Sequence, residues 1–429
     1  MNRANELITD YFDTRAGQLV VQGQKISEWV ERFGTPCFIY DGAVIESKLQ
    51  ELRSAFGPDF EIYYSLKANP DPHVVEFLNA RVDGIEIASA GEFDRAIRSG
   101  CKSQNVLFAG PGKDLNTLHH VISHEIGEIH AESLHELKQI DVVAGELEKK
   151  PNVCLRINPG EQNQGGAMRM GGVAAPFGMD EESIPDVISR CGEFKNINIS
   201  GIHLFAGTQL LDAKTLLSQY RSFLQLAEAV SGLLGRPLQS IDFGGGLGIP
   251  YFSNESKLEL ASISAELQSL ARQVKSIPGF DQTRLMIEPG RFLTAESGIY
   301  ISRVLDIKSS RDVHFVVVDG GMHHHLAASG NLGQVIKRNF PIACLNKLDA
   351  EEHSAYEVVG PLCTPLDRLG RKIQLPQIEP GDLLGIFCSG AYGRSASPTS
   401  FLSHTPPIEI FAHQGAFHSN RIRIEDSDG

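Results

Sequence analysis

Short apolar runs alternate with longer amphipathic runs between about residues 35 and 293, and this alternation limits the possible folds most strongly. Residues 61–65 and 284–287 are typical of the short runs, whereas residues 216–234 have apolar positions at helical spacing. Strands that alternate with helices predict parallel βα units, and about eight of them fit a (β/α)8 barrel of roughly 250 residues. The expected barrel strands are 37–40, 61–65, 84–88, 106–109, 153–157, 202–205, 240–243 and 284–287.

The pattern changes after about residue 293, where long helical runs become scarce. Short apolar runs at 304–308, 314–318, 356–359 and 382–387 are separated by Gly and Pro, which predicts a mostly β domain. We therefore expect an α/β protein with an N-terminal barrel over residues 35–293. Residues 294–429 are expected to form a C-terminal β-rich domain, to which residues 1–34 contribute an N-terminal extension. The charged tail, 421–429, is expected to fray.

Charge and cysteine content exclude several classes of protein. The formal net charge is −14, which disfavours a nucleic-acid partner because phosphate binding needs a basic surface. The seven cysteines are scattered and form no C-x-x-C pair, as is usual in a reducing compartment. Neither the apolar core of a signal peptide nor a membrane-spanning run is present. We expect a cytoplasmic protein with no membrane partner.

Lys67 directly follows the predicted strand 61–65. In a barrel the carboxyl ends of the strands form the active-site face, so a lysine there is a candidate Schiff-base nucleophile. On isolated grounds a solvated loop lysine would be the commoner explanation.

Two further strand ends carry motifs suited to anion chemistry. Gly244, Gly245 and Gly246 follow the predicted strand 240–243, where their backbone N–H groups can approach a phosphate closely. A tight turn is the plain alternative. Glu288-Pro289-Gly290-Arg291 follows the strand 284–287 and offers a carboxylate for a pyridinium nitrogen and a guanidinium for an anion, although it could be a surface ion pair.

The predicted β-rich domain holds three other features. Cys363 lies between two prolines in segment 360–367, and Tyr392 lies within a glycine-flanked segment, 389–393. Taken alone, these features indicate a small buried side chain and a turn. The run His323-His324-His325 invites a metal hypothesis, but three adjacent residues point in different directions and rarely converge on one ion. We therefore predict no metal site.

In their chain order, segments 64–69, 244–248, 288–291, 360–367 and 390–392 resemble the ornithine/diaminopimelate decarboxylase family. These are pyridoxal-phosphate enzymes with the alanine-racemase type of barrel. The resemblance extends from about residue 34 to about residue 410, and it is the ordered set that is specific. It implies pyridoxal 5′-phosphate as cofactor, a small amino-acid-type substrate and a head-to-tail homodimer with two shared active sites.

The roles of individual residues follow from this resemblance. Lys67 forms the internal aldimine with the cofactor, and Glu288 pairs with its pyridine nitrogen. Cys363 comes from the partner subunit and returns a proton to the carbon that has lost CO2. The other cofactor residues that the resemblance implies are Glu86, Arg156, Phe205, Thr208, Gly245, Gly246, Pro289, Gly290, Arg291 and Tyr392. The substrate residues that it implies are Arg291, Thr364, Asp367, Tyr392 and His323.

Three departures from the family pattern bear on the site and its substrate. Phe205 stands where the family usually places a histidine over the cofactor ring, and His203 is two residues earlier. Thr364 replaces the acidic residue that meets the distal amine of ornithine or diaminopimelate. The segment after Gly321 lacks the arginine of diaminopimelate decarboxylases.

Segments 170–173, 177–180 and 318–345 instead resemble a specialised branch of the family. This branch contains the glutamyl–carrier-protein decarboxylase of butirosin biosynthesis, the citryl-diamine decarboxylases of siderophore pathways and decarboxylases associated with exosortase systems. We therefore predict decarboxylation of an amino acid whose distal end is acylated or tethered, with a carrier protein as one candidate for the tether.

Four alternatives remain open at this stage. The first is a diaminopimelate decarboxylase of lysine biosynthesis. The second is an amino-acid racemase, which Glu288 disfavours because racemases of this fold place an arginine at the ring nitrogen. The third is a non-catalytic regulator, against which the presence of Lys67, Glu288 and Cys363 argues. The last and weakest is a metal hydrolase that uses the histidine run.

Overall fold

The computed structural model describes residues 2–160, 168–169, 174–205, 207–334, 336–351 and 353–420, with only the backbone for 168–169. It consists of two compact units. The barrel unit comprises Leu49–Ile249 and Lys257–Phe292, and the β-rich unit comprises Met1–Lys48, Pro250–Ser256 and Leu293–Gly429. The boundaries 35–293 remain a prediction. Segment 170–173 and the tail 421–429, which figured in the sequence analysis, lie outside the described residues.

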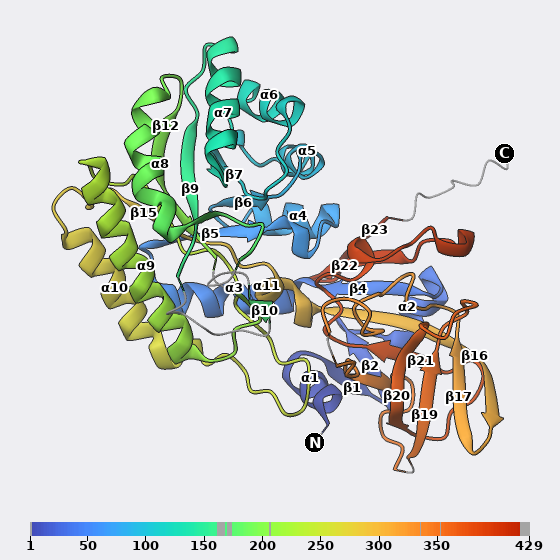
Figure 1. The fold of residues 1–429 in the computed structure, drawn as a ribbon. Helices are drawn as coiled ribbons and strands as arrows, with labels where there is room; N and C mark the ends of the chain where they lie inside the picture. The colour runs from blue at the N-terminus through green and yellow to red at the C-terminus, as the bar shows by residue number, and fades with distance from the viewer. Residues whose placement is uncertain are drawn as a thin grey trace. The chain divides into compact units, whose positions relative to one another are not determined.

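The barrel unit contains eight parallel strands that close on themselves, with helices around them (Figure 1). The order around the barrel is β9-β12-β14-β15-β5-β6-β7-β8, and β8 pairs with β9 to complete the ring. The predicted fold class, a (β/α)8 barrel followed by a β-rich part, is confirmed. The strands are β5 (Phe60–Ser65), β6 (Gly84–Ile87), β7 (Val106–Phe108), β8 (Glu128–Ala131), β9 (Asn152–Asn158), β12 (Asn198–Leu204), β14 (Ser240–Asp242) and β15 (Arg284–Ile287).

Side-chain caps fix where several barrel helices begin. Asp71, Ser89, Asp114, Ser133 and Asp212 each accept a hydrogen bond from a backbone N–H in the first turn of the helix that follows. Each cap lies shortly after a strand, so the chain turns back along the outside of the barrel. The helices are α3 (Gly42–Phe56), α4 (Pro72–Asn79), α5 (Ala90–Arg98), α6 (Leu115–Ser123), α7 (Leu134–Glu146), α8 (Ile184–Arg190), α9 (Ala213–Leu234) and α10 (Ser264–Ser276).

The sequence pattern misassigned one barrel strand. β4 (Cys37–Asp41), expected in the barrel, pairs with β16 (Gly298–Ser310) and with β22 (Ile408–His413) in the sheet of the β-rich unit. Its place in the barrel is taken by β8, which the sequence analysis did not recognise as a strand. β8 escaped notice because it carries Glu128 and His130, both buried, and so lacks a continuous apolar run.

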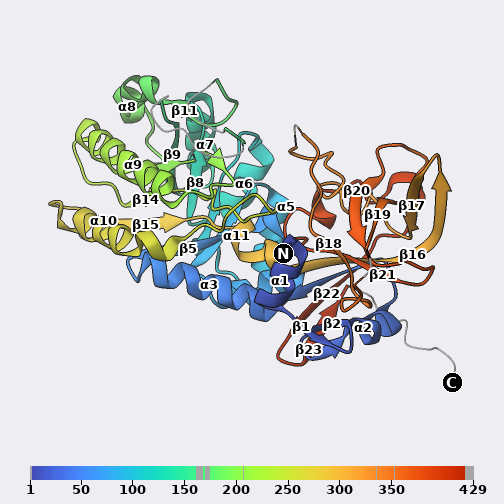
Figure 2. The ribbon, with the colours of Figure 1, turned by 90° about the horizontal axis from the view of Figure 1, so that it is seen from below.

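The β-rich unit is built on the long strand β16, which pairs with three other strands (Figure 2). Its main sheet has the order β20-β19-β17-β16-β4-β22-β23, and β21 joins β18 to β16. The first residues of the chain add two helices and the small sheet β1-β2-β3 to this unit. The elements are α1 (Arg3–Tyr11), β1 (Asp13–Arg15), β2 (Gln18–Val21), β3 (Gln24–Lys25), α2 (Ile26–Phe33), β17 (Val313–Val318), β18 (Ile342–Cys344), β19 (Ser354–Val359), β20 (Arg368–Leu375), β21 (Leu383–Ile386) and β23 (Ala416–Ser419).

Short elements complete the described chain: η1 (Leu66–Ala68), η2 (Ser103–Asn105), β10 (Met168–Arg169), β11 (Met179–Asp180), η3 (Glu181–Ser183), η4 (Cys191–Glu193), β13 (Gly207–Thr208), η5 (Leu260–Ile263), α11 (Arg291–Thr294), η6 (Ala295–Ser297), η7 (Arg394–Ala396) and η8 (Phe401–Ser403). Among the described helices, none has the length and apolar character needed to cross a bilayer.

Candidate active site

Three loops meet at the carboxyl ends of adjacent barrel strands. They are the turn η1 after β5, the glycine loop after β14 and the Glu288–Pro289–Gly290 loop after β15. The backbone N–H of Ser65 donates to the carbonyl of Pro289 (3.2 Å), and the N–H of Glu288 donates to the carbonyl of Gly244 (2.8 Å). A Cβ on Gly290 would lie 2.9 Å from Cβ of Ala68, so only glycine allows this close packing. The structure therefore brings three of the sequence motifs together.

Lys67 projects from η1 and forms an ion pair with Glu86 of β6. Its Nζ lies 3.2 Å from Oε1 and 3.3 Å from Oε2 of this carboxylate. Glu86 is fully buried, whereas the Lys67 side chain is about half exposed. The amine is thus oriented by its partner and still accessible from outside the barrel, which suits a residue that reacts with a carbonyl compound.

The glycine loop forms a narrow backbone turn beside Glu288 and Gly207. Gly244 and Gly246 have φ of +68° and +91°, a region that L side chains rarely adopt. A Cβ on Gly245 would collide with the carbonyl oxygen of Glu288, and one on Gly246 with that of Gly207. Thr208 directly follows Gly207 in the short strand β13. Consecutive N–H groups without side chains form a surface that suits a phosphate.

Glu288 is buried and faces an imidazole. Its Oε2 lies 3.4 Å from Nε2 of His203, while Oε1 has no hydrogen-bond partner among the described residues. Burial raises the pKa of Glu288, but the histidines that face it outweigh burial and hold this pKa below its usual range. An ionised carboxylate with a free buried oxygen can receive an N–H cation, such as a protonated pyridine ring.

The other predicted cofactor residues of the barrel unit occupy separate places around these loops. Arg156 is buried on β9, where its guanidinium donates to Oε1 of Glu132 (2.6 Å) and lies 5.2 Å from the ring centroid of Phe177. Phe205 is half-buried, and its ring lies 3.2 Å from the position that a Cβ of Gly244 would occupy. Arg291 is the first residue of α11.

The remaining predicted site residues belong to the β-rich unit. Cys363 is exposed, and Thr364 is half-buried beside it. Asp367 is buried and accepts backbone N–H groups from Leu362 (2.9 Å) and Met322 (2.6 Å), which anchors the loop that carries Cys363. A direct contact of Asp367 with substrate remains a prediction.

Two more residues of this unit have unusual surroundings. Tyr392 has φ of +53°, a strained conformation for a non-glycine residue and one that is common at functional sites. His323 is fully buried between the rings of His324 and His404, with centroid distances of 3.7 and 4.7 Å, and neither of its nitrogens has a hydrogen-bond partner among the described residues. Their expected contacts with cofactor and substrate remain predictions.

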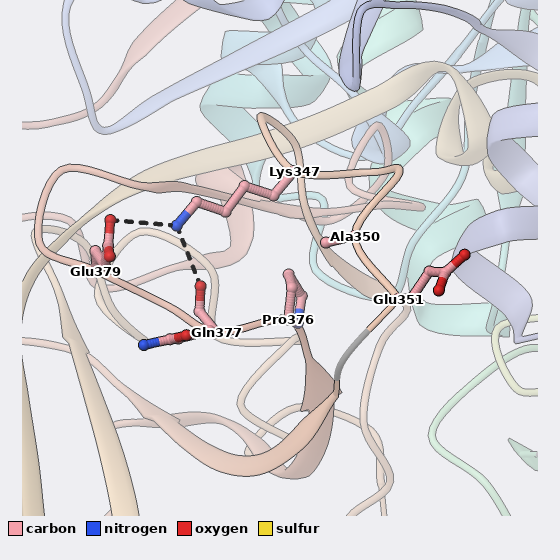
Figure 3. Close-up of a pocket in the computed structure, with 6 residues that line it drawn as sticks. All are labelled: Lys347, Ala350, Glu351, Pro376, Gln377 and Glu379. Atoms are coloured by element: carbon pink, nitrogen blue, oxygen red, sulfur yellow. Dashed lines mark hydrogen bonds and ion pairs between the residues drawn. The ribbon is translucent and has the colours of Figure 1, made fainter.

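A pocket of about 330 Å³ lies elsewhere in the β-rich unit (Figure 3). Lys347 lines it and pairs with Asp382 (2.8 Å) and with Glu379 (3.6 Å). None of the predicted site residues lines this pocket, so we do not assign it to catalysis. Its lining residues are Lys347, Ala350, Glu351, Pro376, Gln377 and Glu379.

Sequence reasoning missed four buried polar residues near the loops: Glu128, His130, Glu132 and Asp242. A usable signal was present for Asp242, which stands just before the glycine loop, and for Glu128 and His130, whose spacing of two is typical of one strand face. Nothing in the sequence indicated that Glu132 would pair with Arg156.

Comparison with known proteins identifies the family. Residues 42–295 match the family model described as "Pyridoxal-dependent decarboxylase, pyridoxal binding domain". The chain belongs to the pyridoxal-dependent decarboxylase family. The resemblance drawn from the motifs is thereby confirmed, as are pyridoxal phosphate as cofactor and the assignment of the protein as an enzyme, a carboxy-lyase.

Individual relatives extend over nearly the whole decarboxylase. It is 37% identical over 396 residues to the L-glutamyl-(BtrI acyl-carrier protein) decarboxylase of Niallia circulans, covering 92% of each chain. It is 28% identical to the 2-((L-alanin-3-ylcarbamoyl)methyl)-2-hydroxybutanedioate decarboxylase of Staphylococcus aureus, covering 88% of this chain and 94% of that one. Among solved structures, a diaminopimelate decarboxylase from M. jannaschii in complex with L-lysine superposes with a TM-score of 0.86 at 25% identity, covering 96% and 94%.

The residues present in the decarboxylase fit its cofactor. The side-chain-free turn at Gly245 and Gly246 suits a phosphate, and the accessible amine of Lys67 suits an aldehyde. Oε1 of Glu288, which has no hydrogen-bond partner in the described part of the chain, suits a protonated ring nitrogen. All three groups belong to adjoining loops of one barrel unit.

Proposed function

We propose that this decarboxylase removes the α-carboxyl group from an amino acid whose distal end is acylated or tethered to a carrier protein. The observation that carries the proposal is the 37% identity, over 92% of both chains, to an enzyme named for a carrier-protein-bound glutamyl group. The Staphylococcus relative supports it, because the substrate in its name is an alanine whose C3 nitrogen is part of an amide. In both named substrates the distal group has no free ammonium.

The loop of Cys363 supports the same conclusion. Thr364, the residue after the cysteine, is uncharged, although diaminopimelate and ornithine decarboxylases place an acid there for the distal ammonium. A substrate with a distal ammonium binds poorly when the site offers no carboxylate to pair with it, because an unpaired buried charge is costly. An amide or ester at the distal end does not carry that cost.

In the proposed mechanism, the barrel loops hold the reacting groups in place. When bound, pyridoxal phosphate supplies an aldehyde that links to an amine and a protonated ring that accepts electron density from the reacting carbon. Lys67 is the amine that holds the cofactor, and its contact with Glu86 keeps Nζ at the end of β5. The glycine loop and Thr208 hold the phosphate, and Glu288 keeps a negative charge opposite the ring nitrogen.

A proton must return to the carbon that loses CO2. We propose that Cys363 of the partner subunit delivers it from Sγ, since the exposed thiol is available to a neighbouring chain. Phe205 is proposed to lie against the cofactor ring in place of the usual histidine, because its half-buried ring borders Gly244.

A screen of CO2 release tests this function. The substrates are free diaminopimelate, free glutamate, a pantetheine thioester of glutamate and a citryl amide of 2,3-diaminopropionate. We expect kcat/KM for one of the conjugates to exceed that for diaminopimelate by at least about 100-fold. Efficient decarboxylation of free diaminopimelate would refute the proposal and favour the diaminopimelate decarboxylases among the structural neighbours. A chiral assay of the unreacted substrate detects racemisation.

The variant Thr364→Asp sharpens the screen. The new carboxylate should lower activity on the preferred conjugate and raise the relative activity on diaminopimelate by roughly ten-fold. Thr364→Ser serves as the matched control, because it keeps an uncharged hydroxyl. If both variants show the same ratio of kcat/KM for the conjugate to kcat/KM for diaminopimelate, residue 364 does not take part in substrate recognition.

A further inference from the structure

The interior of the barrel is polar where most barrels are apolar. Glu128 and His130 from β8, His203 from β12, Asp242 from β14 and Glu288 after β15 are each at most 6% exposed. Barrel interiors are ordinarily filled by branched apolar side chains. In the part of the chain that the structure describes, none of the three carboxyl groups has a lysine or arginine at hydrogen-bond distance. Such groups are costly to bury, so their protonation states and their neighbours in the barrel interior must offset this cost.

The two imidazoles face different oxygens of Glu288. Nε2 of His203 lies 3.4 Å from Oε2, and Nδ1 of His130 lies 3.8 Å from Oε1. The rings themselves lie side by side, with centroids 4.4 Å apart and planes inclined by 33°. Burial lowers the pKa of His203 to about 4, so at neutral pH this ring faces Glu288 in its neutral form. None of the four ring nitrogens has a hydrogen-bond partner among the described residues, so both imidazoles approach Glu288 without completing a hydrogen bond.

His130 also connects Glu288 to the other carboxyl groups. Its Nε2 lies 3.5 Å from Oε1 of Glu128 and 3.8 Å from Oδ2 of Asp242. The second oxygen of Glu128 accepts hydroxyl hydrogens from Ser200 (2.9 Å) and Ser240 (2.7 Å). Burial raises the pKa of Glu128, but its contacts with His130 outweigh burial and bring the pKa down to about 2. Glu128 is therefore an anion.

Asp242 and Glu288 differ in their surroundings. Asp242 accepts the N–H of Gly244 at Oδ1 (2.8 Å), and its Oδ2 has no hydrogen-bond partner among the described residues. Burial, and then the charge of Glu288, raise the pKa of Asp242 well above its usual value. The pKa of Glu288 is held down, as described above. The charged or titratable groups around the pair are Lys67 from η1, Glu128 and His130 from β8, Cys154 and Arg156 from β9, His203 from β12 and Tyr220 from α9.

We propose that His130 and His203 are positioning residues whose rings hold the carboxylate of Glu288 in place. We further propose that, of the two neighbouring carboxyl groups, whose oxygens lie within 4.8 Å of each other, Asp242 is protonated and Glu288 is ionised. Glu288 then remains ionised and oriented toward the ring nitrogen of the cofactor. The inference rests on the proposed function for the role of Glu288, whereas the site of the proton is a property of the barrel interior alone.

Matched amide variants test where the proton resides. Asp242→Asn keeps the contact with Gly244, because Oδ1 can still accept this N–H, and the NH2 group takes the place of a protonated oxygen. Glu288→Gln instead removes the anion. We expect Asp242→Asn to lower kcat less than ten-fold, and Glu288→Gln to lower it at least about 100-fold and to shift the absorbance of the bound cofactor. Equal losses in the two variants would overturn the proposal.

Infrared difference spectroscopy gives a readout that needs no cofactor. The stretching band of a protonated carboxyl group should disappear in Asp242→Asn at pH 7 and persist in Glu288→Gln. A band lost in Glu288→Gln but kept in Asp242→Asn would overturn the assignment. If the predicted bands are found in a protein that cannot take up pyridoxal phosphate, the proposed function fails and the proton assignment stands.

Histidine variants test the positioning role. His203→Gln keeps an N–H donor near the position of Nε2, and His203→Leu does not, so the cofactor should dissociate at least about ten-fold more readily from the leucine variant. Leu107→Ala, which opens space in the apolar part of the barrel beside Tyr63 and Met286, is the control for packing. Equal cofactor affinity in both His203 variants would contradict the role.

A bound metal would contradict the same inference. His130, His203, Asp242 and Glu288 offer atoms that all lie within 4.8 Å of one another, so they could also surround an ion. Metal analysis of the purified holoenzyme should find no stoichiometric metal, because a cation there would occupy the charge of Glu288.

Discussion

Lys67 and Glu86 stand on neighbouring strand ends, with the Lys67 Nζ 3.2 Å from the buried carboxylate of Glu86. The pairing of Ser65 with Glu86 in the β5–β6 register sets this distance, and the Ser65 hydroxyl donates to Glu86 at 2.5 Å. The amine of Lys67 is thus held by two adjacent strands of the barrel.

Removing the charge of Glu86 should impair uptake of the cofactor. Glu86→Gln keeps an acceptor for Ser65 but loses the ion pair that orients Lys67. We expect pyridoxal phosphate to bind more slowly and kcat to fall by about ten-fold. The measurement is the growth of the cofactor absorbance after mixing. Glu61→Gln is the control, because Glu61 lies at the start of β5, the strand that precedes Lys67, and pairs with Arg284. A Glu86→Gln protein that behaves like this control would argue against the role.

Mixing two inactive variants tests whether the sites are shared between subunits. Lys67→Ala and Cys363→Ala should each reduce activity by at least about 100-fold. If each site combines Lys67 of one chain with Cys363 of its partner, hybrid dimers have one intact site. Co-refolded mixtures should then recover about a quarter of wild-type activity. If the mixture is no more active than either variant alone, each active site uses Lys67 and Cys363 of a single chain.

Because His325 is buried, we expect the free energy of unfolding to decrease in acid. Burial lowers its folded-state pKa to about 3, whereas the unfolded value is about 6.5. Below pH 6.5 the unfolded chain therefore binds a proton that the folded chain does not, so stability falls as the pH decreases toward 3. The slope from this residue approaches about 1.4 kcal/mol per pH unit.

Denaturation midpoints between about pH 6.5 and pH 5 measure this effect. His325→Gln keeps a hydrogen-bonding group for Ser389 but cannot be protonated, so its stability should depend less steeply on pH. The exposed residue His353 provides the control variant His353→Gln. Parallel pH curves for wild type and His325→Gln would show that this histidine does not contribute.

Much of the site could be predicted because glycine, proline and charged residues interrupt apolar strands at fixed places. Lys67, Gly245 and Glu288 were recognised in this way, and the structure brings their loops together. The same reasoning failed at β8, since a strand that carries Glu128 and His130 has no apolar pattern. It also failed at β4, because an all-buried strand has the same composition in a barrel as in a β-rich sheet.

Contacts between distant strands were beyond the reach of the sequence. His203 was recognised only as a possible substitute for the missing ring histidine, whereas the structure turns it toward Glu288. The pairing of Arg156 with Glu132 likewise depends on how β9 lies beside β8. Such contacts depend on barrel register, which periodicity alone does not determine.

Borohydride reduction followed by peptide mass spectrometry tests most directly whether Lys67 carries the cofactor. The holoenzyme should lose its visible absorbance on reduction, and a single peptide should carry a phosphopyridoxyl group on Lys67. The Lys67→Ala protein should acquire no such mass. A label on another lysine, or one that persists in Lys67→Ala, would contradict the proposed active site.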